Sequence, residues 1–371
     1  MSFPRGLLDY QMAGWIGGGA AASDFDGDGD VDVFVPTAHG SPNQLYRNRG
    51  DGVFDEVAAE VGLNAEDSAR LALWFDYDGD RRLDLLVLGD YADFEEDRAD
   101  PGVSLIKLYR QAADGSFEEV AATSGLDDGW LRSGLQPVGG ACAGDLNNDG
   151  HLDLCIGIWH GPARILMNEG GAGFRAVAGP IAEPGSYFQP VMMDFNRDGF
   201  LDIYRAVDYD KNELWINAGD ETFTNRADEF GLAHNDTDMG VAVGDYNNDR
   251  RLDLFISNIA LNVLYRNTSS PGTVSFEEVA GLHGVEDTRW GWGCTFFDAD
   301  CDGWLDLAVT NGWDSVFWPA DPSRFFRNSG APGASRFADQ STVSGFDDPL
   351  WGCALVAADF DRDGDQDLLQ T

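Results

Sequence analysis

Positive charge, cysteine and long apolar runs are scarce in this sequence. Its 371 residues include 24 lysine and arginine residues against 65 aspartate and glutamate residues, which gives a formal net charge of −41. Nucleic acid and anionic membrane surfaces would be repelled over most of such a molecule, so cations are the favoured partners. No segment reaches the roughly 18 consecutive apolar residues of a membrane span. Residues 1–10 lack the charged and apolar regions of a secretory signal.

The five cysteines are too few for a disulfide scaffold, and none forms a Cys-x-x-Cys pair of the zinc-binding or thioredoxin-like kind. Cys142, Cys294 and Cys353 each precede an acidic loop in a small or apolar segment, so we expect buried thiols there. Cys142 and Cys155 flank the third acidic loop symmetrically. A cross-strand disulfide between them stays open as an alternative.

What the sequence does contain is one acidic pattern repeated seven times. Apolar residues make up 43% of the chain, enough for a buried core. The pattern reads D-x-[DN]-x-D-x-x-x-D and is followed at once by an apolar run. Its copies start about fifty to seventy residues apart, the length of a four-stranded propeller blade. They occupy residues 24–32, 76–84, 145–153, 194–202, 245–253, 298–306 and 359–367.

Each copy lies within a larger repeating frame. A segment rich in glycine and alanine precedes the loop, as at 17–22, and a β-branched or aromatic run such as 31–35 follows it. A third element ends in Asn, as at 43–48, and a fourth begins at Phe, as at 117–121. Four short strands joined by Gly, Asn and Asp turns are typical of a blade. The sequence therefore predicts an all-β, seven-bladed β-propeller that forms a single domain over residues 1–371.

The blade count contains an irregularity. The first two strands occur seven times but the third only six times, because the chain stops within the seventh repeat. Residues 3–10 fit the Phe-led fourth strand and precede the first loop. We therefore expect the N-terminal strand to close the last blade, and we interpret that blade as incomplete at the C-terminus.

The acidic loops carry the oxygen ligands that calcium prefers. Ca²⁺ accepts six to eight oxygen atoms in a flexible shell, and alternate side chains of a short loop can converge on one ion. Side chains at positions 1, 3, 5 and 9 and the backbone carbonyl at position 7 are the candidate ligands. Position 12 is an apolar strand residue instead of the Glu of an EF-hand. The candidates are Asp24, Asp26, Asp28, Asp30 and Asp32; Asp76, Asp78, Asp80, Arg82 and Asp84; Asp145, Asn147, Asp149, His151 and Asp153; Asp194, Asn196, Asp198, Phe200 and Asp202; Asp245, Asn247, Asp249, Arg251 and Asp253; Asp298, Asp300, Asp302, Trp304 and Asp306; and Asp359, Asp361, Asp363, Asp365 and Asp367.

Up to seven structural calcium sites are predicted, and they are not equivalent. Position 6 is Gly in five loops, as expected where φ must be positive, but Arg81 and Arg250 replace it in the second and fifth. Those two sites are expected to bind most weakly. Asn147, Asn196 and Asn247 at position 3 also lower the carboxylate count. The alternative is that Asp-Gly clusters form tight turns without metal, but seven copies in register favour a metal function.

These motifs resemble the FG-GAP/VCBS repeat family, in particular the group of cartilage acidic protein and the ASPIC/UnbV proteins, and are also similar to the integrin α-subunit propeller. The motifs at 76–84, 108–110 and 117–121 carry the resemblance, which covers nearly the whole chain. It implies a seven-bladed propeller with calcium on one rim and an extracellular or periplasmic location. Many relatives carry a further C-terminal ASPIC/UnbV domain. Neither that domain nor a signal is visible here, so an intracellular location stays open.

The face opposite the acidic loops is the predicted ligand surface. Connections between second and third strands, and between consecutive blades, place aromatic, Arg and His residues there. Such residues stack on sugars or hold an anionic or aromatic small molecule. Packing between blades is the alternative for any single ring. The candidates are His39, Arg70, Trp130, Arg132, Trp159, His160, Tyr187, Asp208, Arg289, Trp290, Trp313 and Trp351.

Two functions fit these residues. The preferred one is a calcium-stabilised binding or adhesion module for a protein or glycan. The alternative is a propeller enzyme of the lyase, cyclase or isomerase type, with His39 or His160 as general base and Arg132 or Arg289 holding an anion. The sequence has no nucleophile motif, no H-E-x-x-H and no phosphate loop to support the enzyme. The insertion at 90–101 is expected to be a solvated loop, with a lid over the ligand face as the alternative.

Overall fold

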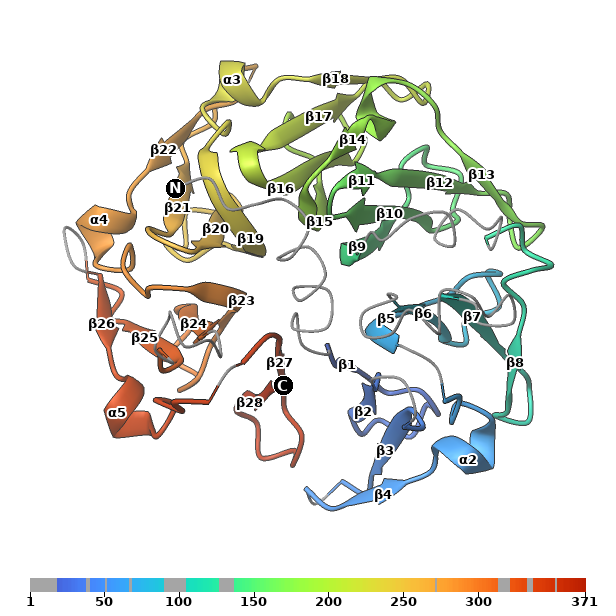
Figure 1. Cartoon of the computed structure of the whole chain (residues 1–371). Helices are drawn as coiled ribbons and strands as arrows, with labels where there is room; N and C mark the ends of the chain where they lie inside the picture. Colours follow the sequence, from blue (N-terminus) through green and yellow to red (C-terminus); the bar gives the residue numbers. More distant parts are fainter. Residues whose placement is uncertain are drawn as a thin grey trace, which may run out of the picture. The chain divides into compact units, whose positions relative to one another are not determined.

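The chain folds into antiparallel β-sheets that follow one another in sequence order (Figure 1). Two compact units are present, Met1–Gly185 and Ser186–Thr371. The predicted strand at 3–10 and the insertion at 90–101 lie outside the described residues. The computed structural model describes residues 19–37, 41–50, 52–66, 69–89, 105–126, 137–270, 272–312, 321–331, 336–350 and 352–371.

The first unit contains three four-stranded sheets, in each of which the strands pair in chain order. A small two-stranded pair joins β11, which lies between β10 and β12 in the chain, to β14. The elements are β1 (Ala21–Ser23), β2 (Asp32–Val35), β3 (Gln44–Asn48), β4 (Phe54–Glu56) and α2 (Ala58–Val61); β5 (Ala69–Phe75), β6 (Asp84–Gly89), β7 (Ile106–Gln111) and β8 (Phe117–Glu119); and β9 (Val138–Gly144), β10 (Asp153–Ile158), β11 (Gly161–Pro162), β12 (Arg164–Asn168), β13 (Phe174–Ala176), η3 (Pro180–Ala182) and β14 (Pro184–Gly185).

The second unit repeats this arrangement, and two of its sheets are joined. β16 pairs with β19 from Asp208↔Thr237 to Lys211↔Asn235, which unites the two sets of strands in one eight-stranded sheet. The elements are β15 (Tyr187–Met193), β16 (Asp202–Lys211), β17 (Glu213–Asn217), β18 (Phe223–Asn225) and α3 (Ala227–Phe230); β19 (Asn235–Gly244), β20 (Asp253–Asn258), β21 (Val263–Asn267), β22 (Phe276–Glu278) and α4 (Ala280–His283); β23 (Gly291–Phe297), β24 (Asp306–Asn311), β25 (Arg324–Asn328), β26 (Phe337–Asp339) and α5 (Ser341–Ser344); and β27 (Leu355–Ala358) with β28 (Asp367–Gln370).

Successive sheets pack face to face within each unit. In the first unit one apolar cluster joins β1–β4 to β5–β8 through residues such as Phe34 and Leu85, and another joins β5–β8 to the third sheet. In the second unit Leu214 and Leu254 belong to one such cluster, and Leu264 and Leu307 to the next. The second strands β6, β10, β20 and β24 are buried along their whole length, because both of their faces meet a neighbouring sheet. This is a propeller-like arrangement of four-stranded sheets.

Glycine is needed on the first strands because these strands approach their neighbours closely. A Cβ atom on Gly240 would lie 2.3 Å from the carbonyl oxygen of Trp292, and one on Gly293 would lie 2.8 Å from that of Cys353. No side chain fits at such distances from a backbone atom. The prediction that small residues belong on the crowded first strands is thus confirmed at Gly240 and Gly293.

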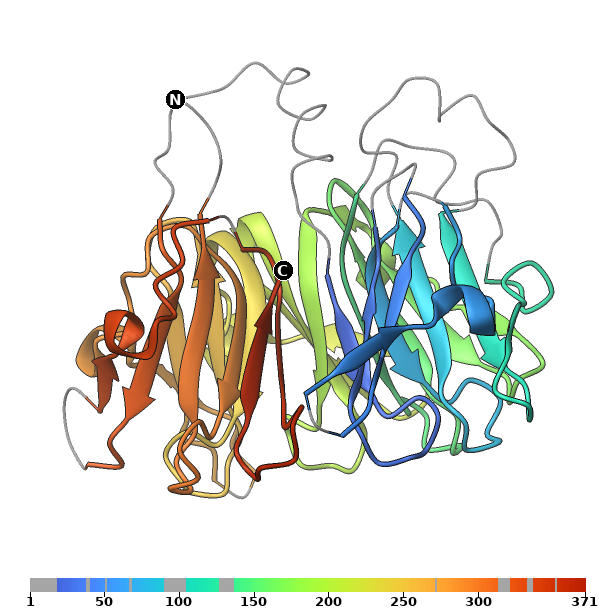
Figure 2. The ribbon, with the colours of Figure 1, turned by 90° about the horizontal axis from the view of Figure 1, so that it is seen from below.

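The acidic loops all lie at the same end of their sheets. Each joins the first strand to the second, so the connection from second to third strand lies at the opposite end. Figure 2 shows this for β27 and β28, whose connecting loop is at the lower edge of the view. The described residues contain the third strand in six repeats and only two strands in the seventh, as predicted. The count of seven blades and the single domain over 1–371 stay predictions.

The cysteines remain thiols. Cys142 and Cys155 lie directly opposite each other on β9 and β10, but both are free. A hydrogen bond with Cys155, together with burial, raises the pKa of the Cys142 thiol. None of the helices in the described part of the chain combines the length and apolar character that crossing a membrane requires.

Candidate functional site

All seven acidic loops share one backbone path. In each, the residues at positions 4 and 6 have positive φ, from 55° at Cys301 to 98° at Gly364. Arg81 (φ 70°) and Arg250 (φ 67°) adopt this conformation although it disfavours side chains with a Cβ atom. The prediction that position 6 requires a left-handed residue is confirmed. The same requirement at position 4, filled by Gly27, Gly79, Asn148, Arg197, Asn248, Cys301 and Arg362, was missed because only two of these residues are glycine.

The first and fifth positions of each loop hold the turn through their carboxylates. In the sixth loop the Gly303 amide donates to Oδ2 of Asp298 at 2.9 Å, and the Trp304 amide donates to Oδ1 of Asp302 at 2.9 Å. The corresponding bonds occur in the other six loops. These carboxylates are therefore fixed by backbone amides toward the loop interior.

The aspartate at position 9 ties its loop to the sheet. Oδ2 of Asp202 accepts from the Phe195 amide at 2.9 Å, and Oδ1 accepts from the Asn217 amide at the end of β17 at 2.8 Å. This aspartate is buried in the first six loops. Burial raises the pKa of Asp202 to about 7 and that of Asp253 to about 8. Burial likewise raises the pKa of Asp32, Asp84, Asp153 and Asp306 to about 6. In each of them, burial outweighs the opposing effect of the backbone amides that donate to the carboxylate.

Four loops bring three carboxylates close enough together to share one cation. Within each group, one oxygen from every carboxylate lies within 4.8 Å of the others. The groups are Asp24, Asp26 and Asp32; Asp76, Asp78 and Asp84; Asp298, Asp300 and Asp302; and Asp359, Asp361 and Asp367. Positions 1 and 3 take part each time, together with position 9 or position 5. Hard oxygen donors at such spacing suit Ca²⁺.

The three loops with Asn at position 3 are arranged differently. The side-chain amides of Asn147 and Asn196 donate to Oδ2 of the aspartate at position 5, at 2.9 and 2.8 Å. That of Asn247 donates to Oδ2 of Asp253 at 3.1 Å. An N–H group cannot ligate a cation, so the amide must give way or turn before such a loop takes up an ion.

Arginines contact the carboxylates of four loops. Nε of Arg47 lies 3.1 Å from Oδ2 of Asp26, and Arg327 contacts both Asp300 and Asp302. Arg82 pairs with Asp80, and Nη2 of Arg251 lies 2.5 Å from Oδ2 of Asp249. A divalent ion would compete with these guanidinium groups for the same oxygens.

An amide side chain at the end of the third strand links neighbouring sheets, a function that the sequence did not indicate. Nδ2 of Asn168 on β12 donates to the carbonyl oxygen of Tyr77, in the loop of the preceding sheet, at 2.8 Å. Gln111 donates in the same way to the Phe25 carbonyl, and Asn328 to the Tyr246 carbonyl, both at 2.8 Å. The Asn that recurs as the last residue of the third strand marks this position in the sequence, but its partner in the neighbouring sheet could not be inferred from it.

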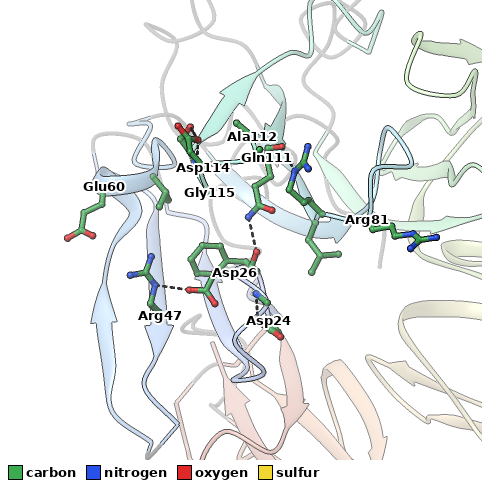
Figure 3. Close-up of a pocket in the computed structure, with 16 residues that line it drawn as sticks. Asp24, Asp26, Arg47, Glu60, Arg81, Gln111, Ala112, Asp114 and Gly115 are labelled. Atoms are coloured by element: carbon green, nitrogen blue, oxygen red, sulfur yellow. Dashed lines mark hydrogen bonds and ion pairs between the residues drawn. The ribbon is translucent and has the colours of Figure 1, made fainter.

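A cavity of about 670 Å³ opens beside the first acidic loop, between the first two sheets (Figure 3). Asp24 and Asp26 of the first carboxylate group line it, as do Arg47 and Arg81. The amide of Gln111 reaches across it to the Phe25 carbonyl. The cavity therefore gives solvent access to the first candidate metal site.

Seven of the twelve predicted ligand-face residues are described. In the first unit Arg70 is half-buried on β5, Trp159 is buried, and its ring centroid lies 4.0 Å from that of the exposed His160. In the second unit Tyr187 and Asp208 are buried. The rings of Trp290 and Trp292 are stacked, with their centroids 6.2 Å apart. Nη1 of the exposed Arg289 lies 3.6 Å from Oδ1 of Asp321. His39, Trp130, Arg132, Trp313 and Trp351 lie outside the described residues.

Tyr187 has an unpredicted cationic neighbour. The guanidinium carbon of the fully buried Arg205 lies 4.0 Å from the Tyr187 ring centroid and 5.6 Å from that of Trp215. Arg205 also pairs with Glu213, which accepts from Trp215 Nε1 at 2.7 Å. The surroundings of Tyr187 fit the packing alternative at least as well as ligand contact.

A histidine–aspartate pair lies at the junction of β16 and β19. Nδ1 of His234 lies 2.8 Å from Oδ2 of the fully buried Asp238. Asn212 and Asn258 donate to the same carboxylate at 2.6 and 2.7 Å. The hydrogen bond to Asp238 raises the pKa of His234 against the opposing effect of burial. Sequence patterns could not predict this pair, because its partners come from three separate segments.

Three stretches of the chain, residues 24–87, 145–205 and 194–256, match the FG-GAP-like repeat family. Over 229 residues the chain is 28% identical to cartilage acidic protein 1 of Xenopus tropicalis, which covers 57% of this chain and 32% of that protein. Over 162 residues it is 28% identical to the human protein of that name, covering 40% and 24% respectively. The chain thus spans about a third or less of the length of these relatives.

Solved structures share the fold at low sequence identity. One is an Agrocybe aegerita lectin described for its specific recognition of non-reducing terminal N-acetylglucosamine. It has a TM-score of 0.53 at 15% identity and covers 86% of this chain and 79% of its own. BBS1N in complex with ARL6DN gives 0.54 at 10% identity, with coverage of 95% and 89%. Identities this low show the fold alone. In this fold the chain carries FG-GAP-like repeats, as its acidic motifs predicted.

Proposed function

We propose that this chain is a calcium-stabilised seven-bladed β-propeller that acts outside the cell or in the periplasm as a binding module. The observation that carries the proposal is the repetition of one carboxylate-lined loop, with the same two left-handed residues, at seven places. Backbone amides use the carboxylates at positions 1, 5 and 9, but a turn does not require an Asp or Asn side chain at positions 1, 3, 5 and 9 of every copy. Calcium ligation accounts for all four, with the position 7 carbonyl as a further ligand.

Electrostatics supports a cation in these loops. Burial and the neighbouring carboxylate of Asp28 raise the pKa of Asp26, and burial and Asp80 do the same for Asp78. Like charges held this close repel each other until a cation is bound. Seven divalent ions would reduce the formal charge from −41 to about −27.

Position 3 provides a direct test of calcium ligation. Asp26→Asn introduces the residue that three other loops already contain, so the fold should tolerate it. We expect calcium affinity at the first loop to fall about tenfold, because one charged ligand is lost. Asn147→Asp should strengthen the third loop by a similar factor. Isothermal titration calorimetry measures both changes.

The matched control is Asp55→Asn. This exposed aspartate pairs with Arg49 and lies outside every acidic loop. Calcium affinities that are identical in the Asp26, Asn147 and Asp55 variants would contradict ligation by position 3.

The ligand is proposed to be a protein or glycan bound at the end of the sheets opposite the acidic loops. A lectin of the same fold recognises N-acetylglucosamine, which supports testing glycans first. Glycan-array binding by the calcium-loaded protein should decrease at least tenfold in His160→Ala and Arg132→Ala. Val53→Ala is the control, since Val53 is exposed in the connection between β3 and β4, at the same end of its sheet as the acidic loop. Unchanged binding in the two face variants would contradict this location.

A further inference from the structure

A polar cluster lies between the sheets β19–β22 and β23–β26 of the second unit. The guanidinium carbon of Arg336 lies 5.2 Å from the Trp304 ring centroid and 5.8 Å from the Tyr246 ring centroid. His283, at the end of α4, meets the Tyr246 ring edge-on at 5.6 Å. Burial lowers the pKa of His283, and the positive charges of Arg336 and of Arg266 on β21 lower it further. Arg336, His283 and two aromatic rings thus lie in contact, and Arg266 acts on the same histidine.

Several hydrogen-bonding groups of this cluster are buried without a partner. Nε and Nη1 of Arg336, Nε of Arg266 and Nδ1 of His283 have no acceptor or donor among the described residues. Three of these four atoms are N–H donors of permanently charged groups. A buried donor left without an acceptor costs about 1–3 kcal/mol, and more if it is charged. The cluster therefore requires an acceptor that the described residues do not supply.

Arg336 is unusual in so acidic a chain. Arg47, Arg226, Arg251 and Arg327 each contact a carboxylate. Among the described residues, no ion pair involves Arg336. Arg266 does pair with Glu277, but through Nη2, which leaves its Nε free for another acceptor. The absence of a carboxylate beside Arg336 leaves room for an external anion.

The corresponding place in the first unit is satisfied by protein groups. Tyr77 occupies the loop position of Tyr246, and Ser124 the helical-turn position of His283. Gly173, which precedes Phe174 as Arg336 precedes Phe337, occupies the position of Arg336. There the Tyr77 hydroxyl donates to the Gly171 carbonyl at 3.0 Å, and Ser124 donates to the Ala121 carbonyl at 3.1 Å. The unsatisfied donors in the second unit are thus a local property of Arg336, Arg266 and His283 rather than of the repeat.

The geometry points to a binding site for a small oxyanion, such as sulfate, phosphate or a free carboxylate, on Arg336, Arg266 and His283. Several oxygens around one centre can accept from both arginines at once, and charge-assisted bonds of this kind are among the strongest. The Trp304 and Tyr246 rings hold the Arg336 guanidinium in place by cation–π contact. The site goes beyond the proposed calcium and ligand-binding functions and uses no carboxylate of an acidic loop.

Equilibrium dialysis with radiolabelled sulfate tests the site, at constant ionic strength and constant calcium concentration. We expect saturable binding of one sulfate per chain. Arg336→Gln should weaken it at least tenfold, since a charged donor is removed. Arg266→Gln, which leaves the aromatic stack intact, should weaken it as well and serves as the second variant if Arg336→Gln does not fold. Far-UV circular dichroism establishes folding of each variant.

Arg226→Gln is the control, because Arg226 is an exposed arginine of the same unit that pairs with Glu229. It should bind sulfate as the unaltered protein does. The proposal is overturned if the unaltered protein shows no saturable sulfate binding, or if a folded Arg336→Gln or Arg266→Gln variant binds sulfate as tightly as the control. Calcium binding is measured in a separate experiment. Failure of the protein to bind calcium would therefore contradict the proposed function but not the oxyanion site.

Discussion

Each acidic loop turns on two residues with positive φ, and its carboxylates at positions 1 and 5 accept backbone amides. These bonds hold the two carboxylates in place without an ion, which would lower the entropic cost of binding one. Glycine fills position 6 in five loops, but Arg81 and Arg250 adopt the same conformation at a backbone cost of roughly 1 kcal/mol. The residue at position 6 thus changes the backbone strain of loops that otherwise share one geometry.

Arg250→Gly should stabilise the protein. The amide that donates to Asp245 is retained, while the strain of a side chain at φ 67° is removed. We expect the free energy of unfolding in chelator to rise by up to about 1 kcal/mol, and calcium affinity at the fifth loop to increase. Urea unfolding and calorimetry measure the two effects.

Gly303→Ala is the reverse case. Gly303 has φ 85° and open space where its Cβ atom would be, so the substitution isolates the backbone effect. It should cost about 1 kcal/mol. A stabilised Gly303→Ala variant, or a destabilised Arg250→Gly variant, would show that positive φ at position 6 does not limit stability.

His234 should make stability depend on pH. Its pKa is raised above the ordinary value of about 6.5 by Asp238. A group with a raised pKa stabilises the folded state fully below its unfolded pKa, and this contribution is lost as pH rises through the folded pKa. The effect should be at most about 1 kcal/mol, because the imidazole is partly exposed.

The comparison of the unaltered protein with His234→Gln isolates this contribution from other titrating groups. The difference in their unfolding free energies should be largest below pH of about 6.5 and should shrink above it. A difference that is constant with pH would assign His234 a packing function only.

At the scale of the elements, the recurring contact between neighbouring sheets is a hydrogen bond donated by a side-chain amide at the end of the third strand. Asn328 donates to the Leu305 carbonyl within its own sheet and to the Tyr246 carbonyl of the neighbouring sheet. Asn267 occupies the same position on β21. Among the described residues, its side-chain amide donates only to the Leu252 carbonyl of its own sheet. Comparing the two residues therefore separates the effect of the hydrogen bond between sheets from that of the hydrogen bond within a sheet.

Asn328→Ala should destabilise the protein more than Asn267→Ala. The first change leaves two buried carbonyls without a donor and the second leaves one, so we expect losses of about 3 and about 1–2 kcal/mol. Chemical unfolding of both variants gives the comparison. Equal losses would mean that the bond between sheets contributes nothing to stability.

The strands and loops were predictable because their signals are local and repeat. The Phe-led fourth strand, the Asn-terminated third strand and the left-handed position 6 all follow from residues within one repeat. Contacts between repeats were not predictable in the same way. Asn328 and Tyr246 are 82 residues apart, and composition could not distinguish a buried ring such as Tyr187 from an exposed one. The cluster around Arg336 likewise depends on three segments meeting.

At the level of the entire chain, much of the surplus of acidic groups is concentrated in the seven acidic loops. Self-repulsion from a net charge of −41 opposes a compact state. Burial raises the pKa of the position 9 aspartates, so their ionisation at neutral pH also opposes folding in the absence of a cation. Calcium in the loops would offset both effects and hold adjacent strands together.

Thermal unfolding with calcium and with chelator tests this account most directly. An ion that binds only the folded state at a hundred times its Kd contributes about 2.7 kcal/mol per site. Several occupied loops should therefore raise the melting temperature by well over about 10 °C. Magnesium at the same concentration should have a much smaller effect. An identical melting temperature with saturating calcium and with chelator would contradict the proposal that calcium in the acidic loops stabilises this fold.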